Sequence, residues 1–524
     1  MIFGIFLLLQ MLLLSLKEHR MDQDKLIGSV YAVTGSRTTV ILSDDLDTLT
    51  RNYKGEVYSI GQIGSYVVIP EGSMQIVAMV VQIRMTDLGD KASLQEEISL
   101  PADKKVLDVQ LLGSIKGGRF ERGVSSYPNV KSPVYMTDKE DLGRIFCAFN
   151  EHDFSVGDIA VFAGRRAYVD PNAFFSKHVA VLGSTGAGKS CTVASILQKA
   201  AALQHAHVVI FDLHDEYSAA FPDANCLHTP EFEIPYWLMN FEELQSVFVD
   251  HTEFTAHNQI MVFRDQVLKS KKAHNPELKD VLTVDTPLYF DITAVYDQVT
   301  ALDKQMVPGK NAEKQGPLYG KLTRFALRLD SKLSDNRYSF IFRPQTFNTS
   351  ASLEDLLKKL LGREKVSPIT ILDLSGTPSD VRDAIVSLLS RTIFDFNFWN
   401  ESREDFPILV VFEEAHSYLP QASDSAFRAS RKAVERIAKE GRKYGVSAMI
   451  VSQRPSEVSE TIVSQCNNFV NLRLTNPTDQ AYVKKLVPDA LSNLIDGLPS
   501  LRQGEALIIG DAVVIPSRLQ VDMP

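Results

Sequence analysis

A glycine-rich octapeptide at residues 183–190, GSTGAGKS, restricts the possible folds of this 524-residue chain more than any other segment. It matches the pattern GxxxxGK[ST] and stands between an apolar, strand-like run (178–183) and a run of helix formers (191–203). In such a strand–loop–helix unit, backbone N–H groups converge on phosphate oxygens, and the positive end of the helix dipole adds to the attraction. The sequence therefore predicts a site for a nucleoside triphosphate.

Individual positions of this loop have separate expected roles. Lys189 is predicted to reach the β- and γ-phosphates of ATP, and Ser190 to hold Mg²⁺. A chance glycine-rich turn is the alternative, but the strand, the helix and every motif position are present. We expect the nucleotide to contact Gly183, Ser184, Thr185, Gly186, Ala187, Gly188, Lys189, Ser190 and Cys191.

Apolar runs on both sides of this loop predict the fold class. Near-continuous apolar strands separated by helical segments are typical of a parallel sheet that is buried on both faces. We therefore predict an α/β fold with a P-loop ATPase core and a mostly parallel sheet. The runs are HVVIFDL (207–213), PITILDL (368–374), FPILVVFEE (406–414), SAMIVSQ (447–453) and NFVNLRL (468–474).

Composition excludes several classes of protein. Apolar residues make up 44% of the chain and charged residues 23%, values that exclude wholesale disorder and a multi-span membrane protein. The net charge of −10 excludes a general basic coat for nucleic acid, so any DNA-binding charge has to be local. Four cysteines lie far apart without a CxxC pair, which fits a reducing, cytoplasmic environment.

Changes in the hydrophobic pattern along the chain predict the boundaries of its domains. Between residues 24 and 130, short alternating runs separated by turns predict a small β-barrel. Residues 150–235 and 365–524 are expected to form the ATPase core, and residues 236–364, rich in lysine and helix formers, a helical insertion. Residues 1–20 are treated as a hydrophobic N-terminal extension.

The apolar run of residues 1–16, MIFGIFLLLQMLLLSL, does not fit a soluble domain. As a helix it would span about 24 Å, which is shorter than a bilayer core of about 30 Å. The favoured interpretation is an over-extended start, with Met21 as the first residue of the working protein, so a membrane partner is not expected. A single membrane anchor and a buried or partner-binding helix are the alternatives.

Paired acids follow the strand ILVVF (408–412) directly. At such a strand end, one carboxylate can face the metal and the next the attacking water. We assign Glu413 to Mg²⁺ and Glu414 to polarising the water. An ordinary acidic start of a helix is the alternative interpretation.

A second acidic segment, DLHDEY (212–217), follows the strand that begins at residue 207. Ligands of open α/β sheets bind at the carboxyl ends of strands, so Asp212 and Glu216 are candidates for positioning water or supporting the metal. Loop acids that cap a helix are the alternative. His214 is expected to be an ordinary hydrogen-bonded histidine rather than a metal ligand.

Residues 428–445 form a basic segment, RASRKAVERIAKEGRKYG, with seven basic and two acidic residues. Its apolar residues recur at helical spacing, so one face packs and the other is cationic. A solvated face, DNA-phosphate contact and an arginine finger offered to a neighbouring subunit are the three interpretations. Arg442 is the candidate finger. Gln453, at the end of the following strand, is the candidate sensor of the γ-phosphate.

From about Leu26 onward the chain resembles the HerA family of hexameric DNA translocases, relatives of FtsK, in its bacterial form. The resemblance rests on the phosphate loop, on DLHDEY (212–217) and VFEEAH (411–416), and on two longer blocks, 438–458 and 464–480. It implies a HAS-type barrel, a RecA-like motor and a central channel for double-stranded DNA. Asp215 departs from the pattern, because glycine is expected there, and this leaves the path of that loop open.

The resemblance also implies a homo-oligomer, expected to be a hexamer, that works with a nuclease in DNA end processing or with an effector in antiphage defence. NurA-like and sirtuin-like proteins are the implied partners. Two alternatives are a ring scaffold that chiefly activates its nuclease or NAD-consuming effector, and a membrane-anchored coupling ATPase of DNA secretion.

Overall fold

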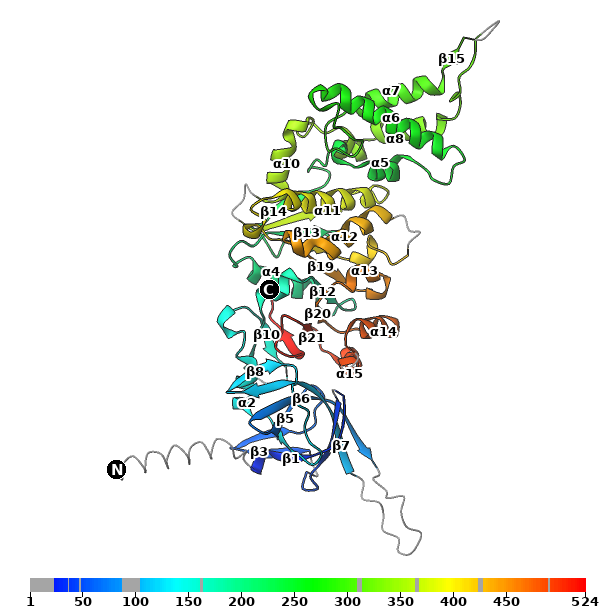
Figure 1. Cartoon of the computed structure of the whole chain (residues 1–524). Helices are drawn as coiled ribbons and strands as arrows, with labels where there is room; N and C mark the ends of the chain where they lie inside the picture. The colour runs from blue at the N-terminus through cyan, green and yellow to red at the C-terminus, as the bar shows by residue number, and fades with distance from the viewer. Residues whose placement is uncertain are drawn as a thin grey trace, which may run out of the picture. The chain divides into compact units, whose positions relative to one another are not determined.

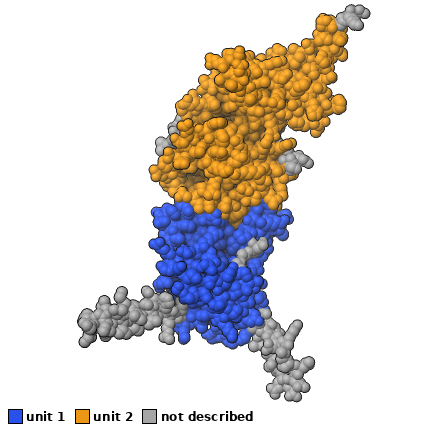
Figure 2. Space-filling view, viewed as in Figure 1, with its two compact units in different colours: residues 1–171, 473–522 blue, residues 172–472, 523–524 orange. Residues whose placement is uncertain are grey.

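The parallel sheet predicted from the apolar runs is present, and so is an antiparallel barrel near the N-terminus (Figure 1). The chain divides into two compact units, residues 1–171 with 473–522 and residues 172–472 with 523–524 (Figure 2). The apolar segment 1–16 lies outside the part of the chain that is described. The computed structural model describes residues 23–35, 37–46, 49–86, 104–160, 164–308, 313–362, 367–422, 427–488 and 491–524.

The first unit contains the barrel. Six antiparallel strands follow the order β2-β1-β9-β5-β6-β7, and pairing of β2 with β7 closes the ring, while β8 extends from β7. Alternating side chains such as Ile76, Ala78 and Val80 fill its core. The strands are β1 (Leu26–Thr34), β2 (Arg37–Leu42), β5 (Tyr66–Glu71), β6 (Met74–Thr86), β7 (Lys104–Lys116), β8 (Arg119–Arg122) and β9 (Pro133–Met136).

Other elements of this unit lie before and after the second unit in the sequence. Strands β3 (Thr50–Tyr53) and β4 (Glu56–Ser59) pair as a hairpin. An antiparallel group pairs β10 with both β11 and β22, and β22 with β21. Its members and the helices of this unit are β10 (Ser155–Ile159), β11 (Arg166–Tyr168), β21 (Glu505–Gly510), β22 (Ser517–Val521), α2 (Lys139–Phe146), α14 (Pro477–Leu486) and α15 (Ser492–Ile495).

The second unit is built on seven parallel strands in the order β20-β12-β19-β18-β13-β17-β14. Every residue of β12, β13, β17, β18 and β19 is buried, as expected for strands covered on both faces. The strands are β12 (Val179–Leu182), β13 (Val208–Asp212), β14 (Asn225–His228), β17 (Ile369–Asp373), β18 (Ile408–Phe412), β19 (Val446–Ser452) and β20 (Asn468–Asn471).

Three main helices connect and cover these strands. Helix α4 (Lys189–Ala200) follows β12, and α11 (Arg382–Trp399) packs against α12 (Arg428–Glu440), which contacts β19. Shorter elements are α3 (Pro171–Ser176) and α13 (Glu460–Val463). Among the residues that the structure describes, no helix has the length and apolar character needed to cross a bilayer.

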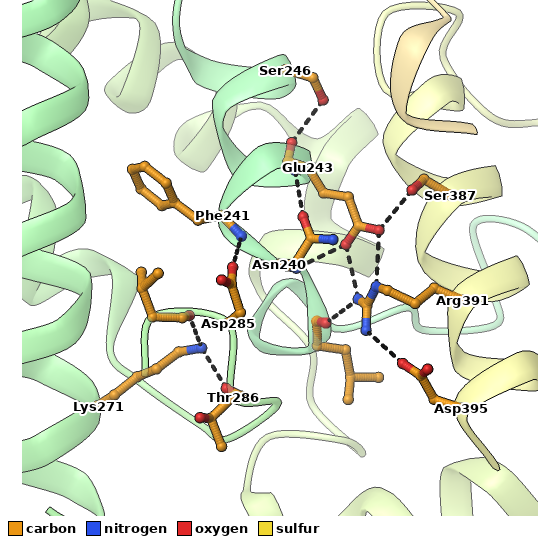
Figure 3. A network of polar contacts seen from close by, with 12 residues as sticks. Asn240, Phe241, Glu243, Ser246, Lys271, Asp285, Thr286, Ser387, Arg391 and Asp395 are labelled. Atoms are coloured by element: carbon orange, nitrogen blue, oxygen red, sulfur yellow. Dashed lines mark hydrogen bonds and ion pairs between the residues drawn. The ribbon is translucent and has the colours of Figure 1, made fainter. Parts of the chain in front are cut away.

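A helical insertion lies between β14 and β17 (Figure 1, green). Its core is aromatic, with Phe263 against Phe241, Phe248 and Phe325 at ring-centroid distances of 5.2–5.8 Å. At its base, Glu243 binds Arg391 of α11 (Figure 3). The helices are α5 (Phe241–Phe248), α6 (Ala256–His274), α7 (Ile292–Asp303), α8 (Thr323–Ser334), α9 (Ser339–Phe342) and α10 (Leu353–Leu360), with the short pair β15 (Met306–Val307) and β16 (Lys314–Gln315).

Candidate active site

The phosphate loop joins the end of β12 to the start of α4. Gly186 and Gly188 have φ of 74° and 99°, in the left-handed region that side chains disfavour. Gly188 is the N-cap of α4 and supplies no capping side chain, so the first N–H groups of this helix remain available to an anion. A Cβ added at Gly183 would lie 2.9 Å from the Cβ of Leu472, which leaves no room for a larger residue.

The two polar residues that open α4 point into the same region. Lys189 is buried, and its positive charge lowers the pKa of both Glu413 and Glu414. The hydroxyl of Ser190 donates a hydrogen bond to Oε2 of Glu216, at 2.5 Å. The predicted metal-binding hydroxyl therefore lies beside a carboxylate from the segment after β13. Cys191, the next residue, carries an exposed free thiol.

Glu413 is enclosed at the end of β18, with 1% of its surface exposed. The hydroxyl of Tyr217 donates to its Oε2, and the hydroxyl of Tyr418 donates to its backbone carbonyl at 2.8 Å. Burial raises the pKa of Glu413 to about 8, assisted by the charges of Glu414 and Glu216 and opposed by the bond from Tyr217. The two hydroxyl groups hold this residue in one orientation. A cation bound beside the carboxyl group would lower its pKa and so favour its ionised form.

Glu414 differs from its neighbour in backbone and in hydrogen bonding. Its φ of 46° places it in the left-handed region. Its buried Oε2 receives no hydrogen bond from the described residues, although Nδ1 of His416 lies 3.1 Å away as an ion-pair partner. Burial raises its pKa, but His416 and Lys189 outweigh burial and hold it below the ordinary value. Glu414 is therefore ionised at neutral pH, with His416 beside its Oε2.

The acids after β13 divide into two roles. Asp212 is fully buried and accepts hydrogen bonds from the N–H groups of His214 (3.1 Å) and Tyr217 (3.0 Å), so it fixes the turn. Glu216 instead reaches Ser190. Asp215 has φ of 54°, so it takes the conformation that favours glycine, and its carboxylate accepts from Ser218.

The donors near Ser190 suit a hard divalent cation. Mg²⁺ prefers oxygen ligands, keeps several waters, and is usually held by one or two carboxylates and by substrate phosphates. Ser190, Glu216 and Glu413 supply a hydroxyl and two carboxyl groups of this kind. Among the described residues, no group of three or more His, Cys, Asp or Glu side chains could hold a metal ion.

Gln453 lies at the tip of β19 and contacts the phosphate loop. Its Oε1 accepts a hydrogen bond from the hydroxyl of Thr185. The preceding residue, Ser452, accepts from the N–H of Gly183 through its backbone carbonyl at 3.3 Å. The structure thus brings Lys189, Glu413, Glu414 and Gln453 to one edge of the sheet.

The basic helix α12 is largely neutralised within the chain. Arg431 and Lys439 pair with Glu435, Lys432 with Glu242, and Arg436 with Asp395. Arg436 also lies over the ring of Phe394, 4.2 Å from its centroid. These ion pairs argue against α12 as the main DNA-phosphate surface. In the described part of the chain, the segment's exposed cations without an ion pair are Arg428, Arg442 and Lys443.

Arg442 does not join the cluster around the phosphate loop. It lies in the short turn Gly441–Tyr444 that precedes β19, whereas Gln453 follows that strand. Near it, buried His178 accepts a hydrogen bond from the N–H of Ala448 at 2.9 Å. Burial, assisted by the charge of Arg442, lowers the pKa of His178 to about 4.

Four site residues were not singled out by sequence reasoning: Tyr217, Tyr418, His416 and Ser452. Tyr217 and His416 stand in the quoted motifs DLHDEY and VFEEAH, so their proximity to the acids was visible. Their contacts were not, because a motif does not specify which side chains of a turn point inward.

Known proteins are similar in sequence to this chain over much of its length. The profile of the central domain of helicase HerA matches residues 154–393. The DNA double-strand break repair helicase HerA of Sulfolobus acidocaldarius is 30% identical over 404 residues, covering 75% of this chain and 74% of that protein. A probable helicase of Methanocaldococcus jannaschii is 26% identical over 524 residues, covering 96% and 91%. Among solved structures, VirB4 of Thermoanaerobacter pseudethanolicus is 16% identical with a TM-score of 0.49, covering 71% of this chain and 96% of that one.

Proposed function

Since the chain belongs to the HerA family of helicases, we propose that it is an ATP-driven translocase or helicase of double-stranded DNA. The observation that carries the proposal is the arrangement at the phosphate loop. An ionised Glu414, whose buried Oε2 has only the imidazole of His416 as a described ion-pair partner, lies at the same sheet edge as Lys189 and the Ser190–Glu216 pair. Such an oxygen is suited to accept a proton from an attacking water.

The residues at this site have different proposed roles in ATP hydrolysis. The loop amides and Lys189 bind the phosphates, and Glu414 orients and deprotonates the water. Ser190, Glu216 and Glu413 would hold Mg²⁺, which when bound neutralises charge on the phosphates. Gln453, bound to Thr185, is placed to respond to the γ-phosphate.

ATP turnover with and without double-stranded DNA tests this function. We expect DNA to stimulate hydrolysis, Lys189→Ala to abolish it, and Glu414→Gln to lower kcat at least about 10²-fold because the general base is lost. Glu404→Gln, a change at an exposed carboxylate in the turn Arg403–Asp405, is the matched control and should leave kcat unchanged. A wild-type protein that hydrolyses no nucleotide would refute the proposal.

We further propose that the protein acts as a ring, most simply a hexamer, in which Arg442 serves the ATP site of a neighbouring subunit. Its exposure and its lack of an ion pair within the described part of the chain support this role. Mass measurement of the native assembly with Mg-ATP tests it. A protein that stays monomeric while hydrolysing ATP would contradict it.

A scaffold for a partner is the second candidate function, and a cleft in the first unit favours it. The cleft has a volume of about 770 Å³ and is lined by Ile27, Val57 and Leu142 among others; Val57 is 69% exposed. We propose that a nuclease or other effector, NurA-like or sirtuin-like, docks there in DNA end processing or antiphage defence. Val57→Lys should release such a partner from the purified complex without changing ATP turnover. If Lys189→Ala leaves the partner's activity intact, scaffolding is the main role.

A further inference from the structure

His416 contacts the candidate catalytic carboxylate but has no part in the hydrolysis described above. Its Nδ1 lies 3.1 Å from Oε2 of Glu414, and the two side chains are 13% and 11% exposed. That Oε2 receives no hydrogen bond from any other described residue. In any form that carries hydrogen on Nδ1, the imidazole is the one group placed to donate to this oxygen.

The same nitrogen also lies near the hydroxyl oxygen of Ser452, the last residue of β19. Nδ1 of His416 lies 3.4 Å from the hydroxyl of Ser452, which is fully buried at the end of β19. That hydroxyl accepts a hydrogen bond from the N–H of Arg454 at 3.0 Å. Because Nδ1 carries at most one hydrogen, its contacts with Glu414 and Ser452 are linked: a stronger bond to one weakens the bond to the other.

Ser452 lies at the start of a segment that is itself joined to the turn containing His416. The N–H of Gln421 donates to the carbonyl of Glu457 at 2.8 Å, and the N–H of Ser459 donates to the carbonyl of Leu419 at 2.9 Å. The strand tips after β18 and β19 therefore form one hydrogen-bonded unit. This unit begins next to Gln453, which contacts the phosphate loop.

We propose that His416 is a positioning residue that fixes the carboxylate of Glu414 for hydrolysis and links its orientation to the tip of β19 through Ser452. Glu414 needs such support because its backbone is in the left-handed region and its Oε2 has no other donor. Without the imidazole no described side chain would fix this oxygen by a hydrogen bond, and small errors in the position of a reacting group reduce rate by about 10²-fold. The inference rests on the proposed ATPase function.

Steady-state ATP hydrolysis by four proteins tests the proposal: the wild type, Glu414→Gln, His416→Ala and His416→Asn. We expect His416→Ala to lower kcat by 10- to 100-fold while KM for ATP and the melting temperature stay within error. Asparagine places an amide near the former Nδ1, so His416→Asn should recover kcat to within about threefold of the wild type. A double-mutant cycle with Ser452→Ala should give effects on kcat that do not multiply.

The outcomes separate the two claims. If the wild type hydrolyses ATP, Glu414→Gln does not, and His416→Ala matches the wild type, the inference is wrong and the proposed function stands. A parallel loss of melting temperature or nucleotide binding in His416→Ala, or multiplicative effects with Ser452→Ala, also overturns it. A wild type without turnover removes the proposed function and the inference together.

Discussion

The buried ion pair between Glu243 and Arg391 allows a stability prediction whose size follows from its contacts (Figure 3). The carboxylate of Glu243 is fully buried and accepts from Arg391 at 2.9 and 3.2 Å, from the hydroxyl of Ser387 at 2.7 Å and from the N–H of Asn240 at 2.8 Å. Arg391 also donates to the carbonyl of Leu238 at 2.7 Å. The pair joins α5 of the insertion to α11.

Arg391→Met removes the positive partner and keeps the buried negative charge. Breaking a buried pair from one side costs about 3–5 kcal/mol, because the remaining charge is uncompensated. Unfolding free energies of domains are about 5–15 kcal/mol, so the base of the insertion should unfold far more readily. Adding Glu243→Met removes the charge as well and should recover most of the loss. About 1 kcal/mol should remain lost, because Glu243 also completes the capping box with Asn240.

Urea unfolding followed by tryptophan fluorescence measures this effect. The chain has two tryptophans. Trp237 is fully buried beside Leu238 and donates to the carbonyl of Phe347 at 2.9 Å, whereas Trp399 is 78% exposed, so the signal reports the base of the insertion. The control, Glu354→Gln, breaks the exposed ion pair with Lys358 and should leave the midpoint unchanged. If Arg391→Met unfolds at the control's midpoint, or the double variant is less stable than the single one, the reasoning fails.

Three further predictions concern single side chains. Tyr217→Phe removes the hydroxyl that orients Glu413, so half-maximal ATP hydrolysis should need about tenfold more Mg²⁺ in a titration; an unchanged requirement would contradict this. Burial lowers the pKa of Lys271 from 10.5 to about 8 in the folded protein. Between these two pH values the amine of Lys271 is protonated in the unfolded chain but mostly neutral in the folded one, so unfolding takes up a proton. The stability of the wild type relative to Lys271→Met should therefore rise by about 3 kcal/mol across that window in urea unfolding, and a flat difference would refute it. Arg442→Ala should lower ATP turnover about 10³-fold, and mixing it with Lys189→Ala should restore part of it; mixtures with no more activity than their components would exclude an intersubunit role.

Continuous apolar runs made the sheet predictable. The run ILVVF coincides with β18, and HVVIFDL contains β13 (Val208–Asp212), because strands covered on both faces need apolar side chains at nearly every position; Asp212 at the end of β13 is an exception. The phosphate loop was predictable for a similar reason, since its chemistry depends on consecutive residues.

The roles of the acids after β13 depended on a turn and were less predictable. Asp212 binds the turn's own N–H groups and Glu216 reaches Ser190, while Asp215 between them has a left-handed backbone. Both assignments were open from the sequence, because either carboxylate can cap a turn. The ion pairs of Lys432 with Glu242 and of Arg436 with Asp395 were equally hidden, because their partners lie 190 and 41 residues away.

The position of Arg442 relative to β19 decides how an arginine finger can act in this protein. Arg442 precedes the strand and Gln453 follows it, so the whole seven-residue strand, Val446–Ser452, lies between the two. At about 3.3 Å per residue the strand alone spans roughly 23 Å, which is far beyond the reach of an arginine side chain. The strands are parallel, so the phosphate loop lies with Gln453 at the carboxyl edge and Arg442 lies at the opposite edge. Arg442 is therefore too far from the phosphate loop of its own chain to contact a nucleotide there, so a direct role of this side chain in hydrolysis would require the site of a second copy.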